Sequence, residues 1–306
     1  MRYQFYTADV FTNRIFGGNQ LAVFPWASGL RSEQMHEVAR EFNISETVFV
    51  LPAENDAHTR RLRIFTPGGE IPFAGHPTVG TAHVLATIGE IQLHGAETRI
   101  IFEEGVGPVP VTINARAGRP RSARLSAAVM PEAGPPPPPV EALAPVLSLP
   151  VEALLGGEWE PEAYSCGVPY LFIPLRDRQA LAAVRLDLAR WEAVLSDYWT
   201  PDLYPFVYDA EADDSPVYAR MFAPALGIPE DPATGSAAAA LAGYLSRRSA
   251  LEHGTLRWAV AQGVEMDRPS LLQVEADRKG GELIAIRVGG ESVMVSEGQM
   301  EIPELT

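Results

Sequence analysis

Two similar stretches of sequence, one in each half of the chain, limit the possible folds most. Residues 76–82 and residues 231–237 both read x-Pro-x-x-Gly-[Thr/Ser]-Ala. Further matches flank them in the same order: residues 63–67 with 220–224, and Gly105-Val106 with Gly263-Val264. The spacing is close to half of the 306 residues, which indicates duplicated domains and not a solenoid. The chain is therefore predicted to consist of two similar halves.

Short strand-like runs alternate with fewer helices in both halves. Helices are expected from Ser32 to Phe42, after Pro77, after Pro232, and around residues 180–184 and 187–198. The strand-like runs, rich in β-branched and aromatic residues, cover residues 22–24, 47–51, 62–65, 109–113, 170–173, 205–208, 218–222, 256–260, 271–276, 283–288 and 292–295. This balance predicts an α+β fold with more strand than helix.

A run of prolines at residues 135–139 interrupts the middle of the chain. Such a run cannot continue a helix or a central strand and favours a stiff, extended connector. We expect a domain boundary near it, and a role as a Pro-rich ligand for another protein is the less favoured alternative. The predicted domains are residues 1–127 and 128–306, with the option that C-terminal strands cross back to the first half.

The composition argues against several classes of protein. Lys and Arg number 24 and Asp and Glu number 39, for a net charge of −15, so neither nucleic acid nor a membrane surface is an expected partner. No apolar stretch approaches the ~20 residues of a membrane span. The N-terminus lacks the pattern of a secretion signal, and a cytoplasmic location is expected. The single cysteine excludes a two-thiol mechanism, and the histidine spacing predicts no metal.

Each copy of the repeated loop has the composition of a small anion site. A proline near a helix start is well placed, and the free N–H groups of the first turn attract anions. Gly80 and Gly235 would let a ligand approach the backbone. The hydroxyl donors are Thr78, Thr81, Thr234 and Ser236. Two such helix ends facing each other would hold a small carboxylate, whereas simple helix capping is the alternative.

Three ionisable residues are candidates for proton transfer. His76 and Asp231 occupy the same place in the two copies of the repeat, one as a possible general acid or base and the other as an acceptor. Glu46 lies between the first helix and an apolar strand, where desolvation would raise its pKa toward a range useful for proton transfer. From the residues alone, a solvated charge at a strand edge remains an open alternative for Glu46.

Several longer motifs resemble the PhzF family of phenazine-biosynthesis-like proteins over almost the whole chain. They are residues 9–12, 16–19, 43–47, 65–67, 70–78, 230–237 and 262–263. The resemblance implies a diaminopimelate-epimerase-like fold, with two pseudosymmetric domains that each wrap a curved, mostly antiparallel sheet around a central helix. It also implies a cofactor-independent isomerase, usually a homodimer. In the phenazine enzyme, a glutamate moves a proton between ring carbons of trans-2,3-dihydro-3-hydroxyanthranilate.

The resemblance implies roles for individual residues as well. The proton-carrying glutamate falls at Glu46, the assisting histidine at His76 and the aspartate at Asp231. The residues expected to bind substrate are Asn19, Gly75, Pro77, Thr78, Gly80, Thr81, Thr234, Gly235 and Ser236. The chain departs from the family at Gln20, where a proline is usual, and at Asp267, where a glycine usually precedes Arg-Pro-Ser.

Three functions remain open at this point. The first is a cofactor-independent isomerase that moves a proton at an acidified carbon of a small carboxylate, cyclic in the phenazine enzyme. The second is a racemase or epimerase with one thiol in each loop, but Cys166 lies in neither loop. The third is a small-molecule binding protein that has lost turnover. Solvent-deuterium exchange with Glu46→Gln as control would separate the first from the third.

Overall fold

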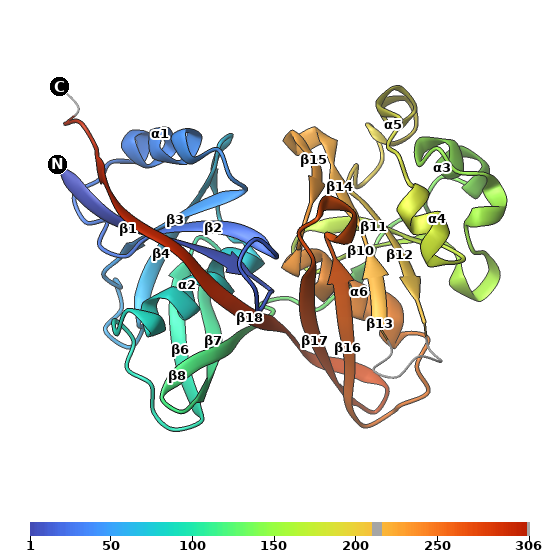
Figure 1. The fold of residues 1–306 in the computed structure, drawn as a ribbon. Helices are drawn as coiled ribbons and strands as arrows, with labels where there is room; N and C mark the ends of the chain where they lie inside the picture. The colour runs from blue at the N-terminus through green and yellow to red at the C-terminus, as the bar shows by residue number, and fades with distance from the viewer. Residues whose placement is uncertain (210–215, 305–306) are drawn as a thin grey trace. The chain divides into compact units, whose positions relative to one another are not determined.

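The computed structural model describes residues 1–209 and 216–304, and the chain divides into two compact units (Figure 1). Unit 1 comprises Met1–Ser126 together with the chain from Gly289 onward, and unit 2 comprises Ala127–Val288. The sequence-based division after residue 127 lies beside the division at Ser126. The proline run lies further along the chain, within unit 2.

Unit 1 is built mainly of strands. Its elements are β1 (Arg2–Val10), β2 (Asn19–Phe24), α1 (Ser32–Phe42), β3 (Glu46–Leu51), β4 (Arg60–Thr66), β5 (Gly69–Ile71), α2 (Gly75–Thr87), β6 (Glu97–Glu104), β7 (Gly107–Arg116), β8 (Arg119–Ser126) and the second part of β18 (Glu282–Glu301). The pairings run from β1 through β2, β3, β4, β6, β7, β8 and β18 back to β1. The strands therefore close into a ring. In it β2–β3 and β4–β6 are parallel, whereas β1–β2, β3–β4, β6–β7, β7–β8 and β1–β18 are antiparallel.

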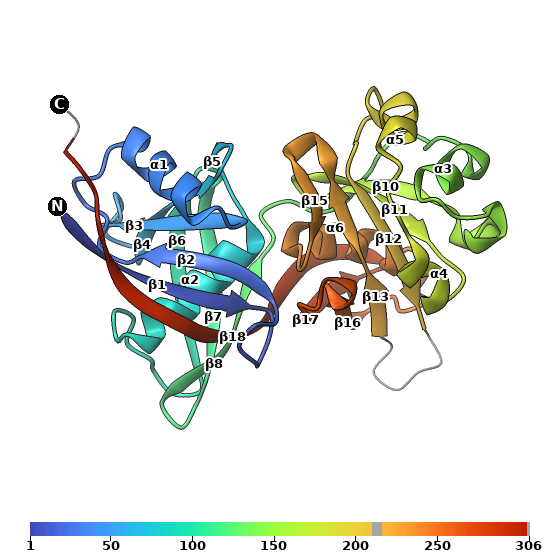
Figure 2. The ribbon, with the colours of Figure 1, turned by 45° about the horizontal axis from the view of Figure 1, so that its top comes forward.

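Helix α2 is the core of unit 1 and is surrounded by its strands (Figure 2). Every residue from Gly75 to Ala86 is buried, as expected for a helix that is apolar on all sides. Helix α1 packs on β3 and β4 through its one-sided apolar stripe. Ser32 is the first residue of α1, as expected, and the N-cap position precedes it. Arg31 takes that place, and its N–H donates to Gln34 Oε1 at 2.9 Å.

Unit 2 repeats this plan with additional helices. Its elements are β9 (Glu132–Ala133), α3 (Val140–Val146), η1 (Val151–Ala153), η2 (Gly157–Trp159), β10 (Glu162–Ser165), β11 (Pro169–Pro174), α4 (Arg178–Ala183), α5 (Leu188–Leu195), β12 (Leu203–Tyr208), β13 (Pro216–Ala219), β14 (Met221–Ala223), η3 (Pro224–Leu226), β15 (Ile228–Asp231), α6 (Gly235–Ser246), β16 (Gly254–Gln262), η4 (Val264–Met266), β17 (Ser270–Lys279) and the first part of β18. Helix α6 is buried like α2 and packs on β9, β10, β11 and β17. The parallel pairs β11–β12 and β13–β16 have counterparts in unit 1. The predicted fold class, an epimerase-like α+β fold, is confirmed.

The structure corrects how the two copies of the repeated loop align. In unit 1 the hairpin strand β5 ends at Ile71, and Pro72, Phe73 and Ala74 lead into α2. In unit 2, β15 ends at Asp231, and Pro232, Ala233 and Thr234 lead into α6. Strand pairing fixes this alignment, because Ile64 pairs with Ile71 and Met221 pairs with Asp231.

The equivalence of His76 and Asp231 proposed from the sequence is therefore wrong. The counterpart of His76 is Ser236, and the counterpart of Asp231 is Ile71. The error has a simple cause: the pattern Pro-x-x-Gly occurs twice in succession in unit 1, starting at Pro72 and again at Pro77. Sequence similarity alone favours the occurrence at Pro77, whereas strand pairing in the hairpin selects the one at Pro72.

Across the described ranges 1–209 and 216–304, we find no helix with both the length and the apolar character needed to cross a membrane.

Candidate functional site

Unit 1 brings Glu46 and His76 together. Glu46 opens β3, which follows α1 after a turn at Asn43, whose left-handed backbone (φ 49°) ends the helix. His76 is the second residue of α2. Their side chains are 12% and 6% exposed, and His76 Nε2 lies 3.0 Å from Glu46 Oε2. We call this pair the Glu46–His76 dyad. The two atoms are at ion-pair distance.

A short chain of hydrogen bonds holds the other side of the imidazole. The Ser45 hydroxyl donates to Asn19 Oδ1 at 3.1 Å, which leaves the Asn19 amide nitrogen to donate to His76 Nδ1 at 3.3 Å. Because Nδ1 then accepts, the neutral ring carries its proton on Nε2, the atom next to Glu46. Asn19 is 1% exposed, so its contacts in this structure are with protein groups.

The remaining candidates of unit 1 lie in the first turns of α2. Gly75, Pro77 and Thr78 are buried, and α2 begins at Gly75 without a side-chain cap from Ala74. Gly80 was expected to let a ligand approach the backbone, but it lies inside α2 with a packing role. A Cβ there would be 2.5 Å from side-chain atoms of both Val10 and Leu21.

Two threonine hydroxyls of α2 are also buried. Thr81 Oγ1 has no hydrogen-bond partner among the described residues. The Thr78 hydroxyl lies 2.8 Å from the Ala74 carbonyl and 2.7 Å from Glu104 Oε1. Thr78 thus connects the start of α2 to the end of β6.

Unit 2 forms a second cluster around Asp231, at the entry to α6. The Thr234 hydroxyl donates to Asp231 Oδ2. Gln262, at the end of β16 and completely buried, donates from Nε2 to the Asp231 carbonyl at 2.8 Å and to Thr234 Oγ1 at 3.0 Å. Its Oε1 accepts from the Thr234 N–H at 3.3 Å and from the Tyr204 hydroxyl at 3.0 Å. These contacts fix the loop that carries Asp231.

The N-terminus of α6 can also bind an anion. Its first residues are Gly235 and Ser236, and Thr234 makes no side-chain cap to the first turn. Uncapped N–H groups at a helix start are an anion site. Ser236 is only partly buried, and its hydroxyl lies 2.7 Å from that of Tyr170.

Sequence reasoning missed several residues that contact the candidate residues or their neighbours. Ser45, Glu104, Tyr170, Tyr204 and Gln262 were given no role of their own. Gln262-Gly263 appeared in the family resemblance, and Gly105-Val106 was matched to Gly263-Val264, so the residues preceding these glycines could have been compared. No sequence signal marks Tyr170 or Tyr204, because their contacts depend on strands that are distant in the sequence.

Burial shifts the pKa of several groups. It raises the pKa of the Glu104 carboxyl to about 8, against an opposing effect of the Thr78 hydrogen bond. It lowers the pKa of His83, within α2, to about 4. It raises the pKa of Cys166 to about 11, and the thiol contacts the Val129 carbonyl at 2.9 Å. A buried thiol of this kind is a poor nucleophile, which argues against the two-thiol alternative.

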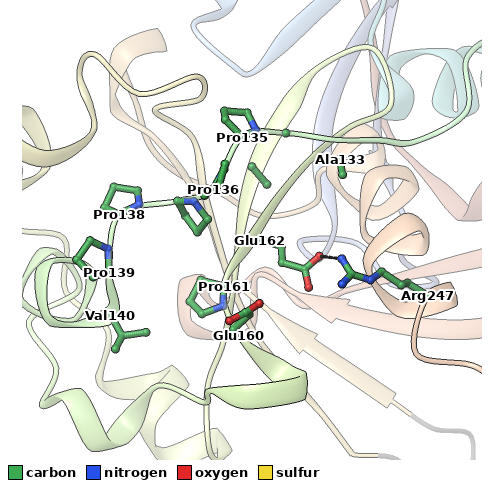
Figure 3. Close-up of a pocket in the computed structure, with 13 residues that line it drawn as sticks. Ala133, Pro135, Pro136, Pro138, Pro139, Val140, Glu160, Pro161, Glu162 and Arg247 are labelled. Atoms are coloured by element: carbon green, nitrogen blue, oxygen red, sulfur yellow. Dashed lines mark hydrogen bonds and ion pairs between the residues drawn. The ribbon is translucent and has the colours of Figure 1, made fainter.

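The proline run lines a separate pocket in unit 2. This pocket has a volume of about 400 Å³ and is bordered by residues 133–140, residues 160–163 and Arg247, which pairs with Glu162 at 3.0 Å (Figure 3). The Tyr198 hydroxyl donates to the Pro135 carbonyl at 2.6 Å. None of the candidate residues for proton transfer or substrate binding lines this pocket.

The chain thus combines a duplicated epimerase-like fold with a buried glutamate–histidine pair at the start of the central helix of unit 1. Comparison with known proteins makes the assignment specific. The family model described as phenazine biosynthesis-like protein (PhzC-PhzF) matches residues 8–298. The chain belongs to this family and is an isomerase.

Individual relatives agree with this assignment. An uncharacterized isomerase from Mesorhizobium japonicum is 39% identical, covering 96% of this chain and 97% of the relative. The trans-2,3-dihydro-3-hydroxyanthranilate isomerase of Pseudomonas aeruginosa is 34% identical, covering 97% and 99%. The crystal structure of a PhzF-family phenazine biosynthesis protein from Bacillus anthracis matches with a TM-score of 0.87 at 24% identity, covering 99% and 100%. This last likeness shows a shared fold.

Proposed function

We propose that the chain is a cofactor-independent isomerase that moves a proton between carbons of a small cyclic carboxylate, with Glu46 as the proton carrier. The observation that carries the proposal is the Glu46–His76 dyad, buried and with its atoms 3.0 Å apart. The related isomerase that acts on trans-2,3-dihydro-3-hydroxyanthranilate supports the substrate class. A cofactor-free reaction, a homodimer and a cytoplasmic location remain predictions.

The proposed reaction conserves all atoms of the substrate. The Glu46 carboxylate removes a proton from a carbon that a conjugated system acidifies, and the electron pair moves into that system. The Glu46 carboxyl, which is 12% exposed and can exchange its proton with water, then returns a proton to another carbon as the electron pair shifts. Since the Asn19 amide favours the Nε2–H form of His76, the imidazole is suited to donate a hydrogen bond toward the carboxylate or the developing charge.

Within unit 2, the first turn of α6 is proposed to bind an acidic group. The uncapped first turn of α6 and the partly buried Ser236 at its start support this assignment. Asp231, fixed by Thr234 and Gln262, is proposed as an acceptor for a polar substituent of the substrate. We expect Ser236→Ala to raise KM by about tenfold, the cost of one hydrogen bond, with a smaller effect on kcat.

The test is turnover of trans-2,3-dihydro-3-hydroxyanthranilate and related cyclic carboxylates, followed by NMR, with binding measured in parallel by calorimetry. Wild type should convert one of these compounds, and Cys166→Ser should convert it equally well. A compound that binds tightly without conversion would favour a binding protein that has lost turnover. Loss of activity in Cys166→Ser would revive the thiol alternative.

A further inference from the structure

The ends of β6 and β16 are equivalent positions in the two units. Each strand ends in a polar residue followed by glycine: Glu104-Gly105 in unit 1 and Gln262-Gly263 in unit 2. Each glycine lies against the proline of its helix-entry loop. A Cβ on Gly105 would be 2.7 Å from Pro72 Cα, and one on Gly263 would be 2.6 Å from the Pro232 carbonyl oxygen. Glu104 and Gln262 therefore occupy matching places beside these loops.

Gln262 shows what a side chain at this place does. As a neutral amide it donates to the Asp231 carbonyl and to Thr234, and it accepts from the Thr234 N–H. These bonds connect the end of β16 to the loop that precedes α6. Glu104 makes a comparable contact one turn further on, since its Oε1 lies 2.7 Å from the Thr78 hydroxyl of α2.

The surroundings of Glu104 favour a protonated carboxyl. The residue is 8% exposed, and its Oε2 is buried with no hydrogen-bond partner among the described residues. The Thr78 hydroxyl has one proton and two acceptors in reach, Glu104 Oε1 and the Ala74 carbonyl. If Glu104 is protonated, its O–H can donate to Thr78 while Thr78 donates to Ala74. An ionised Glu104 would compete for the Thr78 proton, and its buried Oε2 would carry part of the charge with no partner among the described residues.

We propose that Glu104 is a positioning residue that acts as a neutral carboxylic acid. It holds the first turn of α2, and with it His76, as Gln262 holds the loop of Asp231. The proposal rests on the proposed function, because it assigns importance to the placement of His76. The buried carboxylic acid of Glu104 would then have the same function in unit 1 as the Gln262 amide has at the equivalent position in unit 2.

A dependence on pH follows from this assignment. Burial and the Thr78 hydroxyl are the influences that set the pKa of Glu104, at about 8. The charged and titratable residues of its own strand are Glu97, Arg99 and Glu103. The neighbouring elements carry His76 and His83 on α2, Glu70 on β5, Arg60, Arg61 and Arg63 on β4, and Arg116 on β7. Glu103 is bound by His58, and Glu70 by Arg63. Above pH 8, Glu104 ionises in the folded state, and the hydrogen bond from Thr78 to Ala74 is weakened.

The central test compares wild type with Glu104→Gln. Glutamine keeps the shape and cannot ionise, so its kcat near pH 7 should stay within about threefold of wild type, and the alkaline limb near pH 8 should disappear. In urea unfolding, the midpoint of Glu104→Gln relative to wild type should rise between about pH 4.5 and 8 and then level off, because the raised pKa costs wild type stability over that range. An identical pH dependence of stability in the two proteins would overturn the proposal.

Further variants separate positioning from general destabilisation. Thr78→Val removes the hydroxyl and should lower kcat by about tenfold or more, whereas Thr78→Ser should restore it. Glu103→Gln, at the neighbouring position of β6, is the matched control and should leave the alkaline limb unchanged. Equal losses of kcat in Glu104→Gln and Glu104→Leu would contradict a neutral-acid role.

The urea measurement also keeps this proposal separate from the proposed function. It needs no substrate, so a chain without turnover on the tested carboxylates would disprove the function and leave the result for Glu104 readable. Conversely, an active enzyme whose stability has the same pH dependence in wild type and in Glu104→Gln would disprove the neutral-acid role and leave the proposed function standing.

Discussion

Asn19 determines which nitrogen of His76 carries the proton. Its amide is held by Ser45 on one side and faces His76 Nδ1 on the other, so Nε2 is left to interact with Glu46. This arrangement resembles the common use of a second group to orient a catalytic histidine. The direct substrate contact that the family resemblance implies for Asn19 stays a prediction.

Replacing Asn19 by leucine should therefore release the imidazole. We expect kcat to fall by about tenfold to a hundredfold, with a smaller change in KM, because orientation and not binding is lost. ¹⁵N NMR of the imidazoles should show the Nε2–H form of His76 in wild type and a mixture in Asn19→Leu. His83 is an internal reference, because its pKa of about 4 keeps it neutral.

Gln20 provides the control for this experiment. It follows Asn19 on β2 and is exposed, so Gln20→Leu should change neither kcat nor the His76 spectrum. A His76 tautomer that is unaffected by Asn19→Leu would show that other contacts orient the ring.

Helix α2 connects the core of unit 1 to the dyad, and Gly80 lets the helix approach β1 and β2. A methyl group at Gly80 would meet Val10 and Leu21 at 2.5 Å. Alanine favours a helix interior by up to about 1 kcal/mol, but overpacking of a core costs about 1–3 kcal/mol. We therefore expect Gly80→Ala to destabilise the protein in urea unfolding, whereas a gain in stability would contradict this packing.

At the level of elements, the sequence predicted the two central helices and the strong apolar strands. It did not predict β1, β6, β8 or β10. Strand β8 shows why: of its eight residues Arg119–Ser126, only Ala123 and Leu125 are buried, so its apolar signal is weak. Its partners β7 and β18 determine its conformation, and β18 is distant in the sequence.

The candidate site could be predicted only in part from the sequence. Glu46 and His76 each belong to a short, uninterrupted sequence motif, and the structure brings the two side chains together. The alignment of the two repeated loops could not be decided from the sequence, because Pro72 and Pro77 both start the same pattern. Strand pairing in the structure selects Pro72. The roles of Glu104 and Gln262 depend on contacts across the sheet that a linear motif does not contain.

At the level of the whole molecule, strand β18 belongs to both units. Its residues up to Val288 lie in unit 2, and those from Gly289 onward complete unit 1 by pairing with β1. Removing the chain from Gly289 onward should therefore open the strand ring of unit 1. Hydrogen exchange should show loss of amide protection in β1 and β8, whereas β11 and β12 retain it. Uniform protection in the truncated chain would show that unit 1 does not need β18.

The central claim is that Glu46 carries a proton between carbons of the substrate. The most direct measurement is NMR detection of solvent deuterium at substrate carbons after incubation in D₂O with wild type and with Glu46→Gln. Wild type should introduce deuterium at the carbon that receives the proton, and Glu46→Gln should bind the same compound with exchange reduced by at least about a hundredfold. Equal deuterium incorporation by Glu46→Gln, or none by wild type with a compound that it binds tightly, would contradict the account.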